Sequence, residues 1–152
     1  MVSTPAFLLD TGVVLHATRQ NSPVSEALDQ QFGLSTSRFR PAICEVSIGE
    51  LLAFTMSPDK WGERRKAILE AQIRKALVIP ISHPGVYQRF AEISSALRAS
   101  GETVGQNDIW IAAATITAGL TLLTVDRGFR AVARVARLDL CLVDNRTGIR
   151  MP

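Results

Sequence analysis

Four acidic residues, each beside an apolar stretch, could act together in one site: Asp10, Glu50, Asp108 and Asp126. Asp10 and Asp126 directly follow short apolar runs, where ligands bind in an open parallel sheet. Carboxylates that crowd together repel one another and raise each other's pKa. A hard cation such as Mg²⁺ or Mn²⁺ removes that cost, because it prefers carboxylate oxygens. The chemistry expected of such a site is metal-assisted phosphodiester hydrolysis.

Each acid also has an ordinary structural explanation. Asp108 could cap a helix, and Asp10 and Asp126 could be turn residues that bond backbone amides. Glu50 could be a surface residue about a turn and a half into a helix, and Glu45 lies in the same segment. These explanations do not account for the convergence of several predicted acids on one edge of the sheet.

The elements that would position these acids can be predicted from hydrophobic patterning. Five short apolar runs are continuous rather than alternating, as strands buried on both faces should be. They are 6–10, 41–44, 76–81, 120–125 and 138–143. The segments between them are long enough for crossover helices. We therefore expect one α/β domain over residues 1–152, with a mostly parallel five-stranded sheet flanked by helices.

Helical periodicity supports this arrangement. Helices are predicted around 23–34, over 59–77, along an apolar stripe from Val86 to Leu97, and over 109–118. The last of these is apolar almost all round, so it should be central and buried. Asn107 and Asp108 give it a capping signal, while Gly101 and Gly119 fit the ends of the last two helices.

Other acid chemistries on a similar sheet fit less well. A receiver domain needs an acidic pair after its first strand and a lysine after its last. Here Thr11 and Gly12 follow Asp10, and the only lysines lie in the predicted helix 59–77. A haloacid-dehalogenase-like phosphatase would need Asp-x-Asp, which "DTGVV" lacks.

Histidine and cysteine indicate no separate site. His16 and His83 lie in different elements, without a serine or cysteine nucleophile nearby. Cys44 and Cys141 fall in predicted strands, as free buried thiols of a reducing compartment do. No further ligands stand at zinc-site spacing.

Composition is that of an ordinary globular chain, with 47% hydrophobic and 20% charged residues. The longest apolar runs are far shorter than the roughly 20 residues of a membrane span, and the start shows no signal-peptide pattern. A cytoplasmic protein is therefore expected. The net charge is +3, and all but three of the 17 basic residues are arginine. Arginine suits phosphate contacts, so nucleic acid is a plausible partner.

One basic stretch, "RGFRAVARVAR", begins directly after Asp126. If it is helical, its arginines project within one quadrant and its apolar residues face the sheet. The arginines are Arg127, Arg130, Arg134 and Arg137. They could contact nucleic-acid phosphates beside the acids, or form an ordinary solvated face.

Four motifs in order give the chain a family resemblance. "FLLDTGVVL" stands near the start, "SIGEL" spans 47–51, "NDIWIAAATI" opens the predicted buried helix, and "LLTVDRGF" follows the fourth predicted strand. Together they resemble the PIN-domain family over residues 6 to about 143. The nearest match is its toxin branch, the VapC-type ribonucleases of type II toxin–antitoxin pairs.

The resemblance implies a PIN-like fold and a site of four carboxylates holding Mg²⁺ or Mn²⁺. By motif, the site residues are Asp10, Glu50, Asp108 and Asp126. Thr11 and Thr124 match hydroxyls that often stand beside an acid in the family. Glu50 is preferred to Glu45 because Ser47 and Leu51 complete the family's hydroxyl-x-x-Glu-Leu pattern. Gly128 stands where relatives often carry another acid.

The implied activity is metal-dependent endoribonuclease, with RNA as substrate and a small antitoxin as partner. Related toxins are usually dimers, so a homodimer without membrane attachment is expected. Two alternatives remain open. One is a housekeeping PIN ribonuclease of RNA processing, and the other is a PIN domain that binds nucleic acid or protein without cutting.

Overall fold

The computed structural model describes residues 6–35, 40–58 and 61–152. In these residues the strands are β1 (Phe7–Leu9), β2 (Ala42–Cys44), β3 (Leu77–Ile79), β4 (Thr121–Thr124) and β5 (Leu140–Leu142). The helices are α1 (Thr11–Ala17), α2 (Pro23–Phe32), α3 (Glu45–Thr55), α4 (Glu63–Lys75), α5 (Pro84–Ala99), α6 (Gln106–Ala118) and α7 (Phe129–Val135). The first two residues of the predicted helix 59–77 lie outside the described residues.

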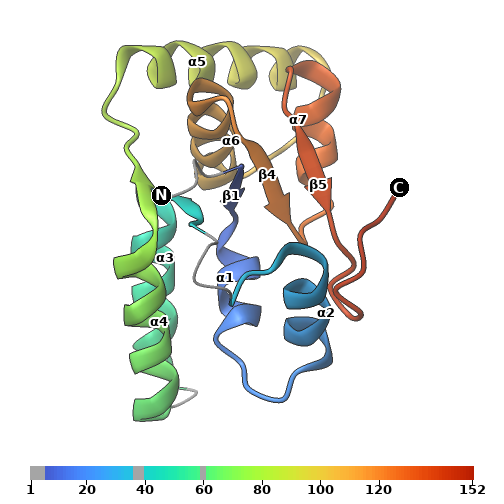
Figure 1. The fold of residues 1–152 in the computed structure, drawn as a ribbon. Coiled ribbons are helices and arrows are strands. Elements are labelled where there is room, and N and C mark those ends of the chain that lie inside the picture. The colour runs from blue at the N-terminus through green and yellow to red at the C-terminus, as the bar shows by residue number, and fades with distance from the viewer. Residues whose placement is uncertain (1–5, 36–39, 59–60) are drawn as a thin grey trace.

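The strands form one parallel sheet in the order β3-β2-β1-β4-β5. The chain builds outward from β1 to β3 and then crosses back to place β4 on the other side of β1 (Figure 1). This confirms the predicted α/β fold with a five-stranded sheet. The strand order reverses between β1 and β4, and this switch point is where open parallel sheets bind ligands.

Alternate residues of the strands face two separate apolar cores. Leu8 and Leu122 lie in a cluster with residues of α5, α6 and α7. Leu9 and Leu123 lie in a second cluster with residues of α1, α2, α3 and α4. Because neighbouring residues of a strand point to opposite faces, helices cover both faces of the sheet. This is why the strand runs are continuously apolar.

Helix α6 is as deeply buried as its composition predicted, with Ile111 to Ala114 fully inaccessible. Its start differs from the prediction. The N-cap residue is Gly105, and the helix begins at Gln106, so Asn107 and Asp108 lie in its first turn instead of capping it. Gly119 ends the helix with φ +69°, as a C-terminal glycine does.

The two cysteines are free and buried, as predicted. Among the helices of the described segments, none is long and apolar enough to cross a lipid bilayer.

Candidate active site

Asp10 is the most enclosed of the four predicted acids, at 6% exposure. It directly follows β1 and is the N-cap residue of α1. Its Oδ1 accepts a hydrogen bond from the Thr11 amide at 2.9 Å, and its Oδ2 accepts one from the Thr124 hydroxyl at 2.7 Å. Burial raises the pKa of Asp10 to about 6, and the charges of Asp126 and Glu50 add to the rise against these hydrogen bonds.

Glu50 reaches the same place from the second turn of α3. Its Oε1 accepts a hydrogen bond from the Thr11 hydroxyl at 2.7 Å, and that hydroxyl also lies 3.0 Å from the fully buried Ser47 Oγ. Its Oε2 accepts a longer hydrogen bond from the side-chain amide of Asn107, at 3.4 Å. Thr11 therefore links the two acids, because its amide bonds Asp10 while its hydroxyl bonds Glu50.

Asp108 stands in the first turn of α6. Burial raises its pKa to about 6, with further contributions from the charges of Asp10, Asp126 and Glu50. Among the described residues its carboxylate has no hydrogen-bond partner, so the capping explanation for Asp108 is wrong. The only compensation that this carboxylate has from the described residues is its place near the positive end of the α6 dipole, against burial and the charges of three other acids.

Asp126 is more exposed and is partly a turn residue. Its Oδ1 accepts a hydrogen bond from the Gly128 amide at 2.8 Å, and its own amide donates to the Thr124 hydroxyl at 3.0 Å. Thr124 is fully buried and bonds both Asp10 and Asp126. The turn explanation therefore holds for Asp126. The Thr124 hydroxyl also links Asp126 to Asp10, because it accepts from the backbone amide of Asp126 and donates to the carboxylate of Asp10.

The fold thus brings the four acids to one edge of the sheet from four elements. Asp10 and Asp126 follow β1 and β4, which flank the switch point, while Glu50 and Asp108 come from helices on opposite faces of the sheet. No three Asp, Glu, His or Cys side chains of the described residues already stand close enough to hold one ion. The donor set itself, all carboxylate with neighbouring hydroxyls, fits a hard divalent cation.

Two nearby acids have other roles. The Glu45 carboxylate accepts a hydrogen bond from the Ile81 amide at 2.5 Å, so it holds the chain after β3. Asp144 follows the edge strand β5 and bonds the amides of Arg146 and Thr147. These contacts favour Glu50 over Glu45 and give Asp144 a turn role outside the cluster.

The histidines are engaged in structural contacts away from the acids. His83 is the N-cap residue of α5, and its Nδ1 accepts from the Gly85 amide at 3.0 Å. His16 Nε2 lies 2.7 Å from Asn145 Oδ1 in the C-terminal segment. Neither supplies a base to the acidic cluster in this arrangement.

The arginine stretch after Asp126 is only partly helical. Helix α7 covers Phe129–Val135, so Arg127 and Arg137 lie outside it, and the four arginines do not share one helical face as expected. Arg134 donates two hydrogen bonds to the Glu102 carboxylate at 2.7 and 2.9 Å. Arg127 lies 3.8 Å from Asp144. In the described residues, Arg130 and Arg137 have no such carboxylate partner.

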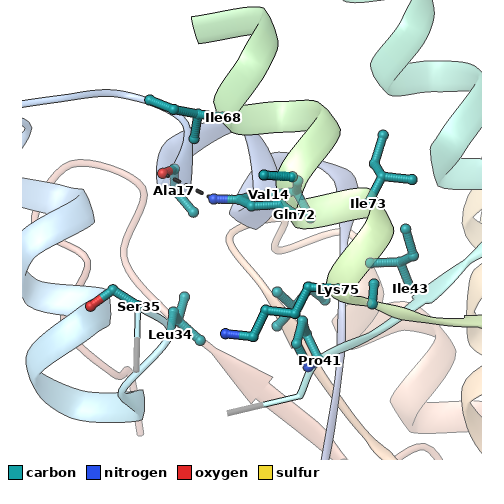
Figure 2. A pocket seen from close by; sticks show the side chains of 13 residues that line it. Val14, Ala17, Leu34, Ser35, Pro41, Ile43, Ile68, Gln72, Ile73 and Lys75 are labelled. Atoms are coloured by element: carbon teal, nitrogen blue, oxygen red, sulfur yellow. Dashed lines mark hydrogen bonds between the residues drawn. The ribbon is translucent and has the colours of Figure 1, made fainter. Parts of the chain in front are cut away.

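An apolar pocket of about 270 Å³ lies apart from the acids, between α1 and α4 (Figure 2). Val14, Ile68 and Ile73 are among the side chains that line it, and the Gln72 amide donates to the Ala17 carbonyl at 3.2 Å. None of the described residues that line this pocket is an aspartate or glutamate, so they offer no ligands of the kind found in the acidic cluster.

The fold and the acidic cluster define an α/β protein with a carboxylate site at the switch point of a parallel sheet. Residues 7–135 match the family model of the PIN domain. The chain therefore belongs to the PIN-domain family, which confirms the resemblance in its sequence.

Solved structures support the same fold. A chain in DNA-bound VapBC from Salmonella typhimurium is 24% identical, with a TM-score of 0.71 and coverage of 90% of this chain and 97% of that chain. A chain in VapBC2 from Rickettsia felis, bound to a promoter DNA fragment, is 22% identical, with a TM-score of 0.69 and coverage of 88% and 96%. A chain in VapBC-5 from Mycobacterium tuberculosis, a member of the VapBC family of toxin–antitoxin systems, is 25% identical, with a TM-score of 0.65 and coverage of 91% and 100%. A comparison with curated proteins finds no match.

Sequence reasoning gave no role in the site to two residues. Ser47 was predicted only as part of a motif, and Asn107 only as a helix cap. In the structure the Ser47 hydroxyl contacts the Thr11 hydroxyl, and the Asn107 side-chain amide contacts Glu50. Ser47 stands one turn before Glu50 on α3, and that i, i+3 spacing is the signal that could have placed them on one face.

Proposed function

We propose that this protein is a metal-dependent endoribonuclease and the toxin of a type II toxin–antitoxin pair. The observation that carries the proposal is the electrostatic state of the cluster. Two buried or half-buried carboxyls, Asp10 and Asp108, have pKa values raised to about 6, and the surrounding acids add to both. Such a cluster costs folding free energy unless a cation completes it, and perturbed acids gather at functional sites.

Asp10, Glu50, Asp108 and Asp126 would hold Mg²⁺ or Mn²⁺. A bound ion would supply an activated water and would offset the negative charge that develops on the oxygens of the phosphoryl group. The protein's own contribution is to orient the carboxylates. Thr124 aims Asp10 Oδ2 and fixes the backbone of Asp126, and Thr11 aims Glu50. Lone pairs that are not used in these hydrogen bonds remain for a cation.

Membership of the PIN-domain family supports nuclease activity, and the similar chains come from toxin–antitoxin complexes. We infer from them that a small antitoxin is the partner of this chain. The basic, arginine-rich composition supports RNA as the substrate. A homodimer is proposed from the family resemblance.

The direct test is cleavage of total RNA by the purified chain in Mg²⁺ or Mn²⁺, with a chelator control and mapping of the cut sites. Glu50→Gln should abolish most of the cleavage, because it removes one charge from the cluster. Glu45→Gln is the matched control, since it makes the same change on the same helix. The Glu45 carboxylate accepts a hydrogen bond from the Ile81 amide and lies outside the cluster. RNA binding without cleavage in any divalent metal would overturn the proposal in favour of a non-cleaving PIN domain. A neighbouring gene for a DNA-binding antitoxin would separate the toxin from a housekeeping ribonuclease.

A further inference from the structure

A basic hollow lies where the end of α1 meets the start of α4. It has a volume of about 660 Å³, and three of the residues that line it are Arg19, Arg64 and Arg65. Gln20 and Gly62 also line it, and none of the lining residues that the structure describes carries a carboxylate. Arginines that are far apart in the sequence thus gather in one concave place outside the acidic cluster.

Arg65 is held in place by two contacts. Its guanidinium lies over the Trp61 ring, 3.6 Å from the centroid, and its Nε donates to the Thr18 hydroxyl at 3.1 Å. Trp61 and Thr18 are both buried, at 9% and 1% exposure. A guanidinium fixed in this way loses little entropy when it binds a further partner.

Arg64 is oriented by a neutral partner. With its amide oxygen toward Arg64, Gln20 accepts hydrogen bonds from Nε at 2.9 Å and from an Nη at 3.1 Å. This orientation is the one in which the amide nitrogen does not face a donor. Because Gln20 carries no charge, the contact positions the guanidinium and leaves its positive charge uncompensated.

The positive charges of the hollow are not neutralised by acids in the part of the chain that the structure describes. Burial lowers the pKa of Arg65, and the charge of Arg19 lowers it further, so these two guanidinium groups repel each other. The nearest acid in sequence, Glu63, lies 3.7 Å from Lys66 and does not line the hollow. Arg134, by contrast, is matched by Glu102.

Backbone groups add to the positive character. Gly62 is the N-cap residue of the 13-residue helix α4 and provides no side-chain cap. The first amides of a helix have no partner within it, and they carry the positive end of its dipole. Together with the three arginines, they favour an anion with several acceptor oxygens, and phosphate matches arginine bidentately.

We propose that this hollow binds a backbone phosphate of the RNA substrate, away from the bond that is cut. The inference rests on the proposed function. The connection to the acids is α1, which begins at Thr11 in the cluster and ends next to Thr18 beside the hollow. Its seven residues span about 10 Å, so one extended RNA strand can contact both places. Phosphate contacts position such a strand without reading its sequence.

The test is RNA binding measured in a chain that does not cut. Every sample carries Asp10→Asn and a chelator, and the probe is a fluorescent, unstructured RNA oligonucleotide titrated at several salt concentrations. The variant is Arg19→Gln with Arg64→Gln, which spares Arg65 because it packs on Trp61. The control is Arg74→Gln with Arg98→Gln, which changes net charge equally at two exposed arginines elsewhere. Thermal unfolding of each chain checks that the fold is retained.

The hollow variant should bind RNA at least about tenfold more weakly, with a salt slope reduced by roughly 0.7 for each lost contact. The control pair should change affinity much less. Equal affinity of the two pairs would overturn the hollow while leaving the proposed function intact. If the chain that carries only Asp10→Asn fails to bind RNA at any salt concentration, the hollow is overturned, and cleavage of RNA by the unsubstituted chain in Mn²⁺ still decides the proposed function. Loss of antitoxin binding in the hollow variant, with RNA affinity unchanged, would assign the hollow to the protein partner and also overturn the proposal.

Discussion

Asp10 joins more of the site than any other residue, because it is buried beside Thr11 and Thr124 and electrostatically linked to Asp126 and Glu50. Asp10→Asn keeps the volume of the side chain but removes one charge from the proposed metal ligands. We expect the fold to survive and RNA cleavage in Mn²⁺ to fall by at least about a hundredfold, the scale of losing a major electrostatic contributor.

The measurement is kcat/KM on a defined RNA, with Asp139→Asn as the control. Asp139 carries the same side chain at an exposed position before β5. The assignment of Asp10 fails if a clean preparation of Asp10→Asn cuts RNA at close to the unsubstituted rate while Asp139→Asn behaves identically.

The raised pKa of Asp10 also predicts how stability depends on pH without metal. Its pKa rises from 3.8 to about 6 on folding, so the folded chain holds a proton that the unfolded chain releases. The stabilisation by protonated Asp10 is complete below about pH 4 and is lost as the pH rises through 6. Above pH 6, metal-free Asp10→Asn should therefore exceed the unsubstituted chain in free energy of unfolding by on the order of 1–3 kcal/mol.

Urea unfolding in chelator at pH 4 and pH 8 measures this difference. It should be largest at pH 8 and much smaller at pH 4, where Asp10 is protonated in the folded chain and partly protonated in the unfolded chain. A variant that is less stable than the unsubstituted chain at pH 8, or a difference that is the same at both values, would count against burial of an ionisable Asp10 beside the other acids. Added Mn²⁺ should stabilise the unsubstituted chain more than the variant at pH 8.

At the scale of elements, α7 decides which arginines of the basic stretch after Asp126 are available to RNA. Arg134 is already paired with Glu102, whereas Arg130 in the same helix has no described carboxylate partner. Arg130→Gln should therefore weaken RNA binding more than Arg134→Gln, although both remove one charge. It should also reduce the salt slope by roughly 0.7, and the set of cut sites should stay the same.

Fluorescence titration of the two single variants in the non-cutting chain makes the comparison. Equal affinities and salt slopes, both unchanged from the parent, would rule out a phosphate contact at α7. A larger loss for Arg134→Gln would mean that RNA displaces Glu102.

The sequence predicted the strands well and the helix ends less well, for physical reasons. Strands such as β4 are buried on both faces, so their runs of apolar residues are unambiguous. The start of α6 was misplaced because Asn107 and Asp108 are good capping residues, while the backbone uses Gly105 and directs Asp108 toward the other acids. The capping preference of Asn107 and Asp108 therefore does not determine where the helix begins. Departures of this kind from local sequence preference are expected near functional sites.

The site shows the same division. Asp10 and Asp126 could be placed near each other from the sequence, because the carboxyl ends of parallel strands meet at one edge of the sheet. The contacts of Ser47 and Asn107 depend on how α3 packs beside α6, which is a tertiary fact. The pairing of Arg134 with Glu102 likewise joins α7 to the segment after α5. The periodicity of residues within one helix cannot predict a partner that lies in another part of the chain.

At the scale of the whole molecule, the concentration of negative charge at one edge of a chain with net charge +3 matters for its partners. A protein inhibitor could satisfy the acids with a cation of its own. If this chain is a toxin, we expect its antitoxin to insert an Arg or Lys among Asp10, Glu50, Asp108 and Asp126, taking the place of the metal's charge. Charge complementarity of this kind sets specificity and becomes costly to break once it is desolvated.

The prediction has two measurable parts. Asp126→Asn should weaken the antitoxin complex, with a change mostly in the dissociation rate, since truncating one partner of a buried charge pair acts there. The Asp139→Asn control should leave the complex unaffected. Mn²⁺ and the antitoxin should also compete, so that the metal lowers the apparent affinity of the antitoxin for the unsubstituted chain more than for the variant. A co-crystal in which the antitoxin lies wholly away from the four acids, while they still hold a metal ion, would refute this mode of inhibition. Inhibition would then have to act by blocking the approach of RNA. The basic hollow lined by Arg19, Arg64 and Arg65 would be the first surface to examine for antitoxin contacts.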